Sequence, residues 1–301
     1  MKIYFLINQH AGGKCADIHD RIRSSMEEAG EDKDSYCIEA TQSDSLIEQI
    51  VHAFKQADTV IGMGGDGTVH AMINGYMKSG EKGKKMGLIP AGTGNDFFRH
   101  FCPYRKYIKN RKTYIFRLIS GRIEKHSIWQ AGETYFSNYF SIGYDAAVIC
   151  DFDRRRKKRN KHSGRLRNYI AYTLLGIANM TYSTDREIIL STDKGEVRSG
   201  KGIIVSNVRR YAGGSYLPWE NEDTLCAVPF RNSWDYTKLM LSRIRRKPVR
   251  TKGMLFFKQG KLADPPQDTV QVDGEPYDYN KIGKEIEFRK AGTVDVLVAE
   301  L

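Results

Sequence analysis

The chain has 301 residues, of which 40% are hydrophobic, and this is enough to fill two cores of ordinary domain size. Eight prolines, 28 glycines and five scattered cysteines without a C-x-x-C pair exclude a collagen-like chain, a disulfide framework and a zinc ribbon. The formal net charge of +12 comes from two basic runs, residues 154–167 and 243–252, which together hold fifteen Lys or Arg and no acid.

The first 120 residues alternate short apolar runs with stretches of helical period. Strands are expected at 3–7, 35–39, 59–61 and 85–89. Helices are expected at 18–26, at 46–54 behind a capping box formed by Ser45 and Glu48, and at 69–77. Nearly continuous apolar strands separated by amphipathic helices predict a parallel sheet covered on both faces.

The pattern changes near residue 122, after which short apolar runs follow one another closely. Expected strands are 128–130, 134–142, 187–191, 202–208, 225–228, 254–257, 270–273, 286–289 and 294–299, and expected helices are 166–177 and 236–244. Many short strands separated by turn residues favour an antiparallel sandwich or barrel. The sequence therefore predicts an α/β domain over residues 1–122 and a β-rich domain over residues 123–301.

A glycine-rich turn, Gly62-Met63-Gly64-Gly65-Asp66-Gly67-Thr68, follows the expected strand at 59–61. Glycines at a strand-to-helix junction let a ligand approach the main chain, and the amides at the helix N-terminus face a phosphate. Asp66 would repel a pyrophosphate unless a cation lies between them, so its presence favours Mg²⁺ or a substrate hydroxyl that it orients. The structural alternative is a tight turn in which Asp66 caps the helix.

A second turn, Pro90-Ala91-Gly92-Thr93-Gly94-Asn95-Asp96-Phe97, follows the next expected strand. The carboxyl ends of neighbouring parallel strands form the crevice where ligands bind. The two turns are therefore expected to line one cleft with Asp66, Thr68, Thr93, Asn95 and Asp96, although Asn95 and Asp96 could also be helix caps. No Gly-Lys pair is followed by Ser or Thr, which excludes a Walker A loop.

Three motifs resemble those of the bacterial diacylglycerol kinase-type lipid kinases: Gly64–Thr68, Pro90–Phe97 and Val272-Asp273-Gly274-Glu275. That family is related to the sphingosine and ceramide kinases and more distantly to NAD kinases and phosphofructokinases. The resemblance covers essentially the whole chain. It implies an N-terminal parallel-sheet nucleotide-binding domain of the phosphofructokinase and NAD-kinase type, a C-terminal antiparallel β-sandwich, and an ATP site in the cleft between them.

The resemblance also implies roles for individual residues. Nucleotide contacts would come from the first turn with Asn8 and Gly12, from Thr41, and from the two glycine turns with Gly64, Gly65, Asp66, Gly67, Thr68, Thr93, Asn95 and Asp96. Glu275 would accept the proton of the lipid hydroxyl and Asp66 would be the second catalytic carboxylate, with the choice of general base between them left open. From the local sequence alone, Asp273-Gly274-Glu275-Pro276 is a hairpin turn between residues 270–272 and Tyr277.

A structural Mg²⁺ in the second domain is a further implication of the resemblance. Its ligands would be Asp223, Glu220 and the carbonyl of Leu225, and oxygen ligands of this kind suit a hard cation. The segment departs from the family pattern, because it is short and Thr224 stands where the family has a glycine after the aspartate.

The preferred interpretation is an ATP- and Mg²⁺-dependent kinase that phosphorylates diacylglycerol or a related lipid alcohol in phospholipid biosynthesis. Such an enzyme must reach a bilayer, so Arg154–Arg167 and Arg243–Lys252 are the expected contacts with an anionic membrane. The apolar face of 166–177 is a second candidate for this contact. The N-terminus lacks the pattern of a signal peptide, which predicts a cytoplasmic protein. The basic runs predict that it associates peripherally with the membrane. A homodimer is a further expectation.

Two other interpretations remain. A kinase of a soluble small molecule, as among the NAD-kinase relatives, would use the same first glycine turn. A basic nucleic-acid-binding module would use the two basic runs for phosphate contacts, but it leaves both glycine turns unexplained. No nucleic acid partner is therefore expected.

Overall fold

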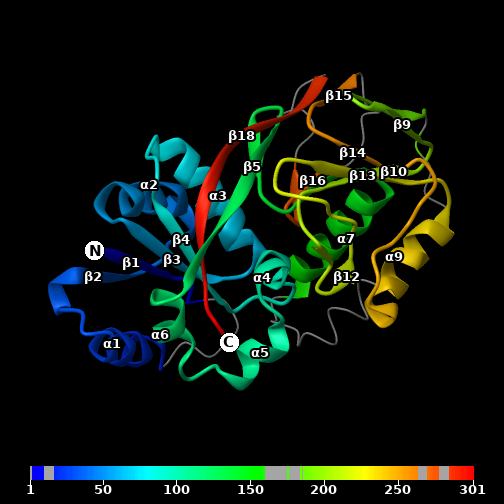
Figure 1. Cartoon of the computed structure of the whole chain (residues 1–301). Coiled ribbons are helices and arrows are strands. Elements are labelled where there is room, and N and C mark those ends of the chain that lie inside the picture. Colours follow the sequence, from blue (N-terminus) through cyan, green and yellow to red (C-terminus); the bar gives the residue numbers. More distant parts are fainter. Residues whose placement is uncertain are drawn as a thin grey trace. The chain divides into compact units, whose positions relative to one another are not determined.

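The chain forms two compact units, shown in Figure 1. The computed structural model describes residues 2–9, 17–159, 175, 184, 186–263, 270–277 and 285–301, with only the backbone for 156–159. Unit 1 consists of Met1–His126 and Thr293–Leu301, and unit 2 of Ser127–Gly292. The division expected at residue 122 does not include this return of the C-terminus to unit 1.

Unit 1 is built on a parallel sheet with the strand order β2-β1-β3-β4. Its strands are β1 (Ile3–Ile7), β2 (Tyr36–Ala40), β3 (Thr59–Gly64) and β4 (Lys85–Pro90). The C-terminal part of β18 (Glu285–Val298) adds a further parallel strand beside β4. Both β1 and β3 are buried along their whole length, as apolar strands covered by helices should be. The predicted parallel sheet is confirmed.

The helices of unit 1 include the three that the period predicted. They are α1 (Ile18–Glu28), α2 (Leu46–Gln56), α3 (Asp66–Ser79), α4 (Asp96–Phe101), α5 (Tyr104–Lys109) and α6 (Tyr114–Ile119), with short 3-10 turns at Lys33–Ser35 and Ser43–Ser45. Helices α4 to α6 were missed because six residues are too few to display a helical period. The capping box at Ser45 is wrong, since its hydroxyl donates to Gln42 Oε1 (3.3 Å) and makes no cap bond.

Unit 2 contains two antiparallel sheets. One has the order β14-β13-β10-β7-β16-β17, and the other joins β9, β8, β15 and the N-terminal part of β18, with β5 and β6 beside it. The strands are β5 (Arg122–Ala131), β6 (Thr134–Phe136), β7 (Tyr139–Gly143), β8 (Ile188–Thr192), β9 (Gly195–Ser199), β10 (Gly202–Ser206), β13 (Leu225–Phe230), β14 (Leu255–Phe257), β15 (Gly260–Ala263), β16 (Val270–Val272) and β17 (Glu275–Tyr277). A separate ribbon pairs β11 (Arg210–Tyr211) with β12 (Ser215–Tyr216).

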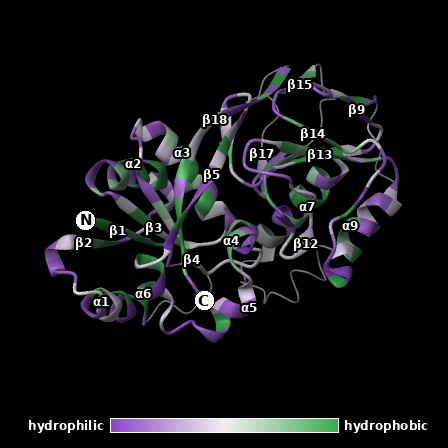
Figure 2. Cartoon of the chain, viewed as in Figure 1, coloured by the Kyte–Doolittle hydropathy of each residue, from purple (hydrophilic) through white to green (hydrophobic). Residues whose placement is uncertain are grey.

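One hydrophobic core joins the two sheets of unit 2. Trp129 and Phe288 of one sheet share a buried cluster with Phe140 and Ile203 of the other. The rings of Phe140 and Phe288 meet edge to face with centroids 5.1 Å apart. Hydrophobic residues follow the central strands of each unit in Figure 2, while hydrophilic residues lie on outward helix surfaces. The predicted β-sandwich is confirmed.

Two helices of unit 2 contain residues of the predicted basic runs. Helix α7 (Tyr144–Arg159) was not predicted, and its last residues form the start of the first basic run. Helix α9 (Ser233–Arg245) confirms and lengthens the helix expected at 236–244. The helix expected at 166–177 lies outside the described residues except for Leu175. Within the described part of the chain, no helix combines the length and apolar character needed to cross a membrane.

Candidate active site

The predicted nucleotide contacts of unit 1 follow the carboxyl ends of adjacent strands. Asn8 comes after β1 and its amide donates to Met63 O (3.2 Å) on β3. Thr41 comes after β2 and its amide donates to Ile7 O (3.0 Å) at the end of β1. The two glycine turns follow β3 and β4. The parallel order of these strands therefore brings the described candidate residues to one edge of the sheet. Gly12 lies outside the described residues.

The two glycine turns are in direct backbone contact. The amides of Ala91 and Gly92 both donate to Gly64 O, at 2.8 and 3.2 Å. A Cβ added to Gly92 would lie 2.5 Å from the Gly65 Cα, and one added to Gly65 would lie 2.9 Å from the Gly92 Cα. Atoms this close clash, so the approach of the two turns requires glycine at both positions.

Asp66 ties the first turn to the second through its carboxylate. It is the first residue of α3, and its Oδ1 accepts a hydrogen bond from the amide of Phe97 (3.1 Å). Gly65, and not Asp66, is the N-cap of α3, so the structural alternative of an aspartate cap is wrong. Thr68 lies two residues further along α3 and is buried, with its hydroxyl over Gly64. The N-terminus of α3 thus presents backbone amides and one carboxylate at the same edge, where an anion would be favoured.

The second turn is closed by the side chain of Asn95. This residue is fully buried and adopts a left-handed φ of 53°. Asn95 is also the N-cap residue of α4, as the alternative interpretation expected, although its side chain makes no cap hydrogen bond to that helix. Arg99, which no sequence motif marks, donates from Nε to Gly94 O (2.8 Å) and braces the turn from α4. Thr93 is exposed at its tip, whereas Asp96 is buried.

Glu275 belongs to unit 2 and stands at the end of a two-residue hairpin turn. Strands β16 and β17 pair so that Val272 lies opposite Glu275. The intervening Asp273 and Gly274 have φ of 53° and 88°, and positive values at both positions are the mark of a type I′ turn. The hairpin expected from the local sequence is therefore present.

Asp273 is bound into the fold by its carboxylate. It is fully buried and accepts hydrogen bonds from the amides of Ser137 (3.1 Å), Asn138 (2.7 Å) and Tyr139 (3.1 Å). Its own amide donates to Tyr139 O (2.8 Å). These donors compensate the charge that burial would otherwise penalise, and they fasten the turn to the bend between β6 and β7.

A second buried carboxylate supports the same turn through a glutamine. Gln271 Oε1 accepts from the amide of Gly274 (2.7 Å), and its Nε2 donates to Asp145 Oδ2 (3.4 Å). Asp145 is fully buried and also accepts hydrogen bonds from the hydroxyls of Ser141 (2.6 Å) and Tyr211. Gly274, which precedes Glu275, is thus held by Gln271, and Asp273 is held by the amides of residues 137–139. Together these contacts fix the backbone that carries Glu275. No motif in the sequence signals this network.

The residues expected to bind a structural Mg²⁺ have other surroundings. The exposed Asp223 carboxylate pairs with Lys290 Nζ (2.5 Å), and this ammonium group lowers the pKa of Asp223. Glu220 is exposed, and Leu225 begins β13. Lys290 supplies the positive charge that a bound metal would bring, so the residues present do not fit the implied ion. We derive no step through it.

The second basic run divides at Arg243. The Arg243 side chain is partly buried, and its Cδ, Nε and Cζ pack within 3.5 Å of the position that a Cβ on Gly214 would take. From Arg245 to Lys247 the side chains are exposed. In the first run the side chains of Arg154 and Arg155 are exposed, and those from residue 156 onward lie outside the described ones.

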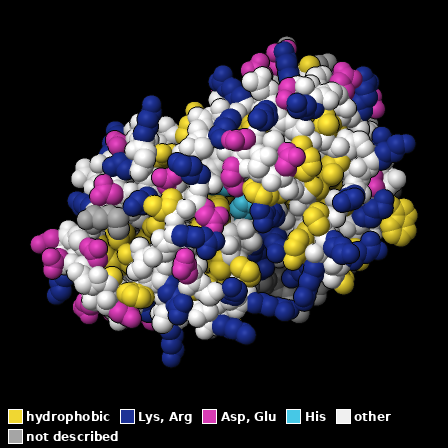
Figure 3. All heavy atoms as spheres, viewed as in Figure 1, with side chains coloured by type: hydrophobic (Ala, Val, Ile, Leu, Met, Phe, Trp, Pro, Cys, Tyr) yellow, Lys and Arg dark blue, Asp and Glu magenta, His cyan; other side chains and the backbone are white. Residues whose placement is uncertain are grey.

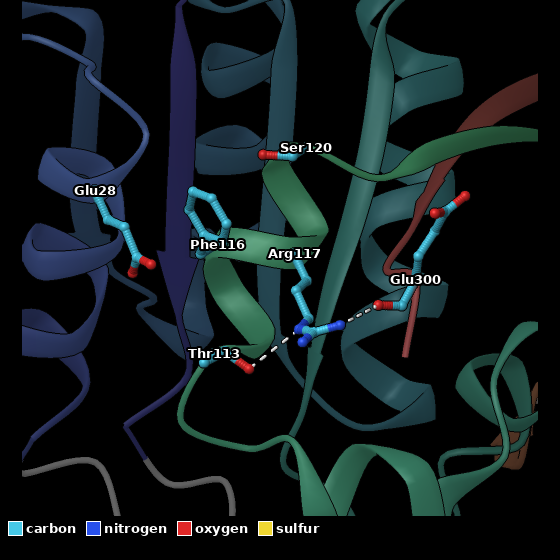
Figure 4. Close-up of a pocket in the computed structure, with 6 residues that line it drawn as sticks. All are labelled: Glu28, Thr113, Phe116, Arg117, Ser120 and Glu300. Carbon is cyan, nitrogen blue, oxygen red and sulfur yellow. Dashed lines mark hydrogen bonds between the residues drawn. The ribbon is translucent and has the colours of Figure 1, made fainter.

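A hollow of about 330 Å³ in unit 1 lies apart from these residues (Figure 4). Its lining residues are Glu28, Thr113, Phe116, Arg117, Ser120 and Glu300. Arg117 donates to Thr113 Oγ1 (3.2 Å) and to Glu300 O (3.0 Å), which holds α6 against the C-terminus. None of the predicted site residues lines it.

Comparison with known proteins gives two matching family models. They are the diacylglycerol kinase catalytic domain over residues 2–131 and the diacylglycerol kinase accessory domain over residues 135–233. A solved structure, described as a diacylglycerol kinase from Bacillus anthracis, shares 16% sequence identity and has a TM-score of 0.67, covering 99% of this chain and 96% of its own. At that identity the likeness demonstrates a shared fold.

Curated relatives match over shorter regions. A Staphylococcus carnosus protein provisionally named a lipid kinase is 25% identical over 205 residues, which are 67% of this chain and 60% of the relative. Mouse diacylglycerol kinase delta is 32% identical over 104 residues, which are 31% of this chain and 8% of the mouse protein. The chain thus spans 60% or less of the length of these relatives.

Proposed function

The chain belongs to the diacylglycerol kinase-type family of lipid kinases, and we propose that it transfers the terminal phosphoryl group of ATP to the hydroxyl of a lipid alcohol. Diacylglycerol is the first acceptor to consider, because both matching family models carry its name. The observation that carries the proposal is the hydrogen bond from Phe97 N to Asp66 Oδ1 (3.1 Å), which fastens two glycine turns together around one carboxylate.

Phosphate binding is assigned to the edge of the sheet in unit 1. The turn at Gly64 and Gly65 leads directly into α3, whose first amides favour a negative charge. The second turn adds Thr93 at its exposed tip. Because two glycines keep side chains away from this contact, a triphosphate could approach the main chain closely.

The two carboxylates receive complementary roles in this proposal. Mg²⁺ bound with ATP would neutralise the charge on the phosphates, and Asp66 is the carboxylate beside the phosphate-binding turn that would hold it. Glu275 would accept the hydroxyl proton while the acceptor oxygen bonds to the terminal phosphorus and the bond to the bridging oxygen of ADP breaks. Asp66 is the alternative base, so its variants must be compared with those of Glu275.

Access to a lipid acceptor requires contact with a membrane. We assign this contact to the exposed part of the basic runs, Arg154 with Arg155 and Arg245 to Lys252, because each basic residue near an anionic surface contributes roughly 1 kcal/mol of attraction. Binding to vesicles should then weaken as the salt concentration rises.

Phosphoryl transfer to a panel of lipids tests the proposal. Labelled ATP is incubated with diacylglycerol, undecaprenol, ceramide or phosphatidylglycerol in mixed micelles. Wild type should label diacylglycerol, and Asp66→Asn and Glu275→Gln should each lower kcat by about 100-fold or more, the usual effect of losing a catalytic charge. The exposed acids Asp44 and Glu133 provide matched controls, Asp44→Asn and Glu133→Gln, which should retain activity.

Two outcomes would overturn the proposal. Full activity in both Asp66→Asn and Glu275→Gln would remove the assigned site. Turnover of water-soluble acceptors without any labelling of lipid would favour a kinase of small molecules instead.

A further inference from the structure

Helix α9 is anchored to unit 2 by one face. Tyr236, Leu239 and Met240 are buried in a hydrophobic cluster that also contains Phe230 and Val249. The helix begins at a regular cap, in which Asn232 Oδ1 accepts from the amide of Asp235 (3.2 Å). Packing and capping of α9 are thus complete without any contribution from its outer face.

The outer face of α9 exposes large apolar side chains. Among the described residues, four large hydrophobic side chains are exposed, and two of them, Trp234 (70%) and Ile244 (75%), belong to this helix. At 100° per residue, the half-buried Leu241 projects between them on the same side of the helix. The ten residue steps of this apolar strip, from Trp234 to Ile244, span about 15 Å along the axis. Trp234 and Ile244 therefore leave most of their apolar surface outside the packing of unit 2.

Positive charge surrounds this apolar strip. Lys238, Arg245, Arg246 and Lys247 are exposed, and Arg250 follows them. The acid in the α9 sequence, Asp235, is buried and accepts from Arg231 N (3.1 Å) and Lys238 Nζ (2.9 Å). In Figure 3, Lys and Arg side chains with hydrophobic ones among them cover the region where Figure 1 shows α9. The outer face is therefore both apolar and strongly cationic.

Arg246 places a cation at a backbone position whose left-handed conformation favours glycine. It is the C-cap of α9 and has a left-handed φ of 54°. Helices commonly end in this conformation, and glycine adopts it at less cost than a residue with a side chain. An arginine here adds an exposed charge at the end of the apolar strip at some cost in backbone strain.

We propose that the outer face of α9, formed by Trp234, Leu241 and Ile244 with Lys238 and Arg245 to Lys247, inserts into the interface of an anionic bilayer. Tryptophan prefers the headgroup level, the aliphatic side chains reach the acyl boundary, and the cations meet anionic headgroups. A second copy of the chain fits less well, because a two-fold contact would place one cationic face against the other. The inference rests on the proposed function, since it supplies the contact through which a lipid kinase would reach its acceptor.

Vesicle binding with matched variants tests the inference. Wild type, Trp234→Ser/Ile244→Ser and the control Ile108→Ser/Ile123→Ser are mixed with vesicles of phosphatidylcholine and 30% phosphatidylglycerol. The control removes the two exposed isoleucines of unit 1. We expect the α9 variant to bind at least tenfold more weakly and the control to stay within twofold. Brominated acyl chains should quench the emission of wild type more than that of the α9 variant, which keeps the buried Trp129 and the half-buried Trp219 but lacks the exposed Trp234.

Arg246→Gly tests the effect of this charge on vesicle binding without a loss of folding stability. Glycine relieves the left-handed backbone, so thermal stability should be kept or raised, while loss of one cation should weaken binding to anionic vesicles by about fivefold. Equal vesicle binding by wild type and Trp234→Ser/Ile244→Ser would overturn the inference. The inference would also be overturned if wild type formed a dimer that these substitutions dissociate and did not bind vesicles.

Activity on a short-chain, water-soluble diacylglycerol distinguishes this inference from the proposed function. The α9 variant should phosphorylate this dissolved acceptor as wild type does and lose activity only on vesicles. If wild type binds vesicles through α9 but phosphorylates neither acceptor, the proposed function fails and the α9 inference stands. If both proteins are equally active on vesicles, the α9 inference fails and the proposed function stands.

Discussion

Asn95 and Gly92 hold each other by two hydrogen bonds: Asn95 Oδ1 accepts from Gly92 N (3.0 Å), and Asn95 Nδ2 donates to Gly92 O (2.9 Å). One fully buried side chain therefore closes the second glycine turn from inside. Because Gly92 also bonds to Gly64 O, the closure of this turn sets the position of the first one. The proposed phosphate site thus depends on a residue that need not touch phosphate.

Substitution of Asn95 should separate this closure from backbone conformation. Asn95→Ala removes both hydrogen bonds to the half-buried Gly92, whose amide keeps its bond to Gly64 O, and should lower the free energy of unfolding by about 1–3 kcal/mol. It should also raise the KM for ATP. Asn95→Gly removes the same bonds but tolerates the left-handed φ, so it should be less destabilised while its KM for ATP rises equally. Thermal unfolding and ATP kinetics give the two readings; an Asn95→Ala protein with wild-type stability and KM would contradict the assignment.

Gly92→Ala probes the contact between the turns. The new Cβ would lie 2.5 Å from the Gly65 Cα, and neither backbone can move without loss of the bonds to Gly64 O. We expect the KM for ATP to rise at least tenfold and the melting temperature to fall, because the two backbones must separate. Gly200→Ala is the matched control, because a Cβ there meets nothing within 4 Å. Equal effects of the two substitutions on the KM for ATP would argue against a phosphate site between the turns.

These contacts mark the boundary of what the sequence could predict. The position of both turns at one sheet edge followed from the alternation of strands and helices, because parallel strands end at the same side. The bond from Phe97 to Asp66 could not be foreseen, since residue types do not reveal which donor faces which acceptor. The same holds for Lys290, which meets Asp223 across 67 residues of sequence. From the sequence, Asp273 is an ordinary turn residue. Its burial depends on the bend between β6 and β7, which is distant in the sequence and contacts it only in the fold.

Asp273→Asn should destabilise unit 2 more than any change at Glu275. The buried carboxylate accepts from three backbone amides, and an asparagine amide would set its own donors against them. A hydrogen bond to a charged group contributes about 1.5–3 kcal/mol, so weakening this set of bonds should cost at least that much. Glu275→Gln, two residues away, should keep wild-type stability and lose activity. Urea unfolding followed by far-ultraviolet circular dichroism measures both, and the prediction fails if the two variants unfold at the same urea concentration.

The ion pair of Asp223 and Lys290 predicts how the protein responds to magnesium. Since the ammonium group already neutralises this carboxylate, Mg²⁺ without nucleotide should leave the melting temperature unchanged, and chelation should not lower it. Lys290→Met removes the competing cation, so any Mg²⁺ stabilisation should emerge only in that variant. A rise in the melting temperature of wild type with Mg²⁺ that Asp223→Asn abolishes would instead support the metal site implied by the family resemblance.

The thiols of the buried Cys102 and the half-buried Cys150 predict a loss of stability at high pH. Burial raises the pKa of each thiol from 9.0 to about 11, because desolvation penalises the thiolate. In the unfolded chain both thiols ionise near their ordinary pKa, so between about pH 9 and 11 the unfolded state loses protons that the folded state keeps, and the free energy of unfolding falls as pH rises. Urea unfolding at pH 8, 9, 10 and 11 measures this fall. Cys102→Ser/Cys150→Ser, which cannot ionise at these positions, should show a shallower decline, and an identical decline in both proteins would assign the effect to other groups.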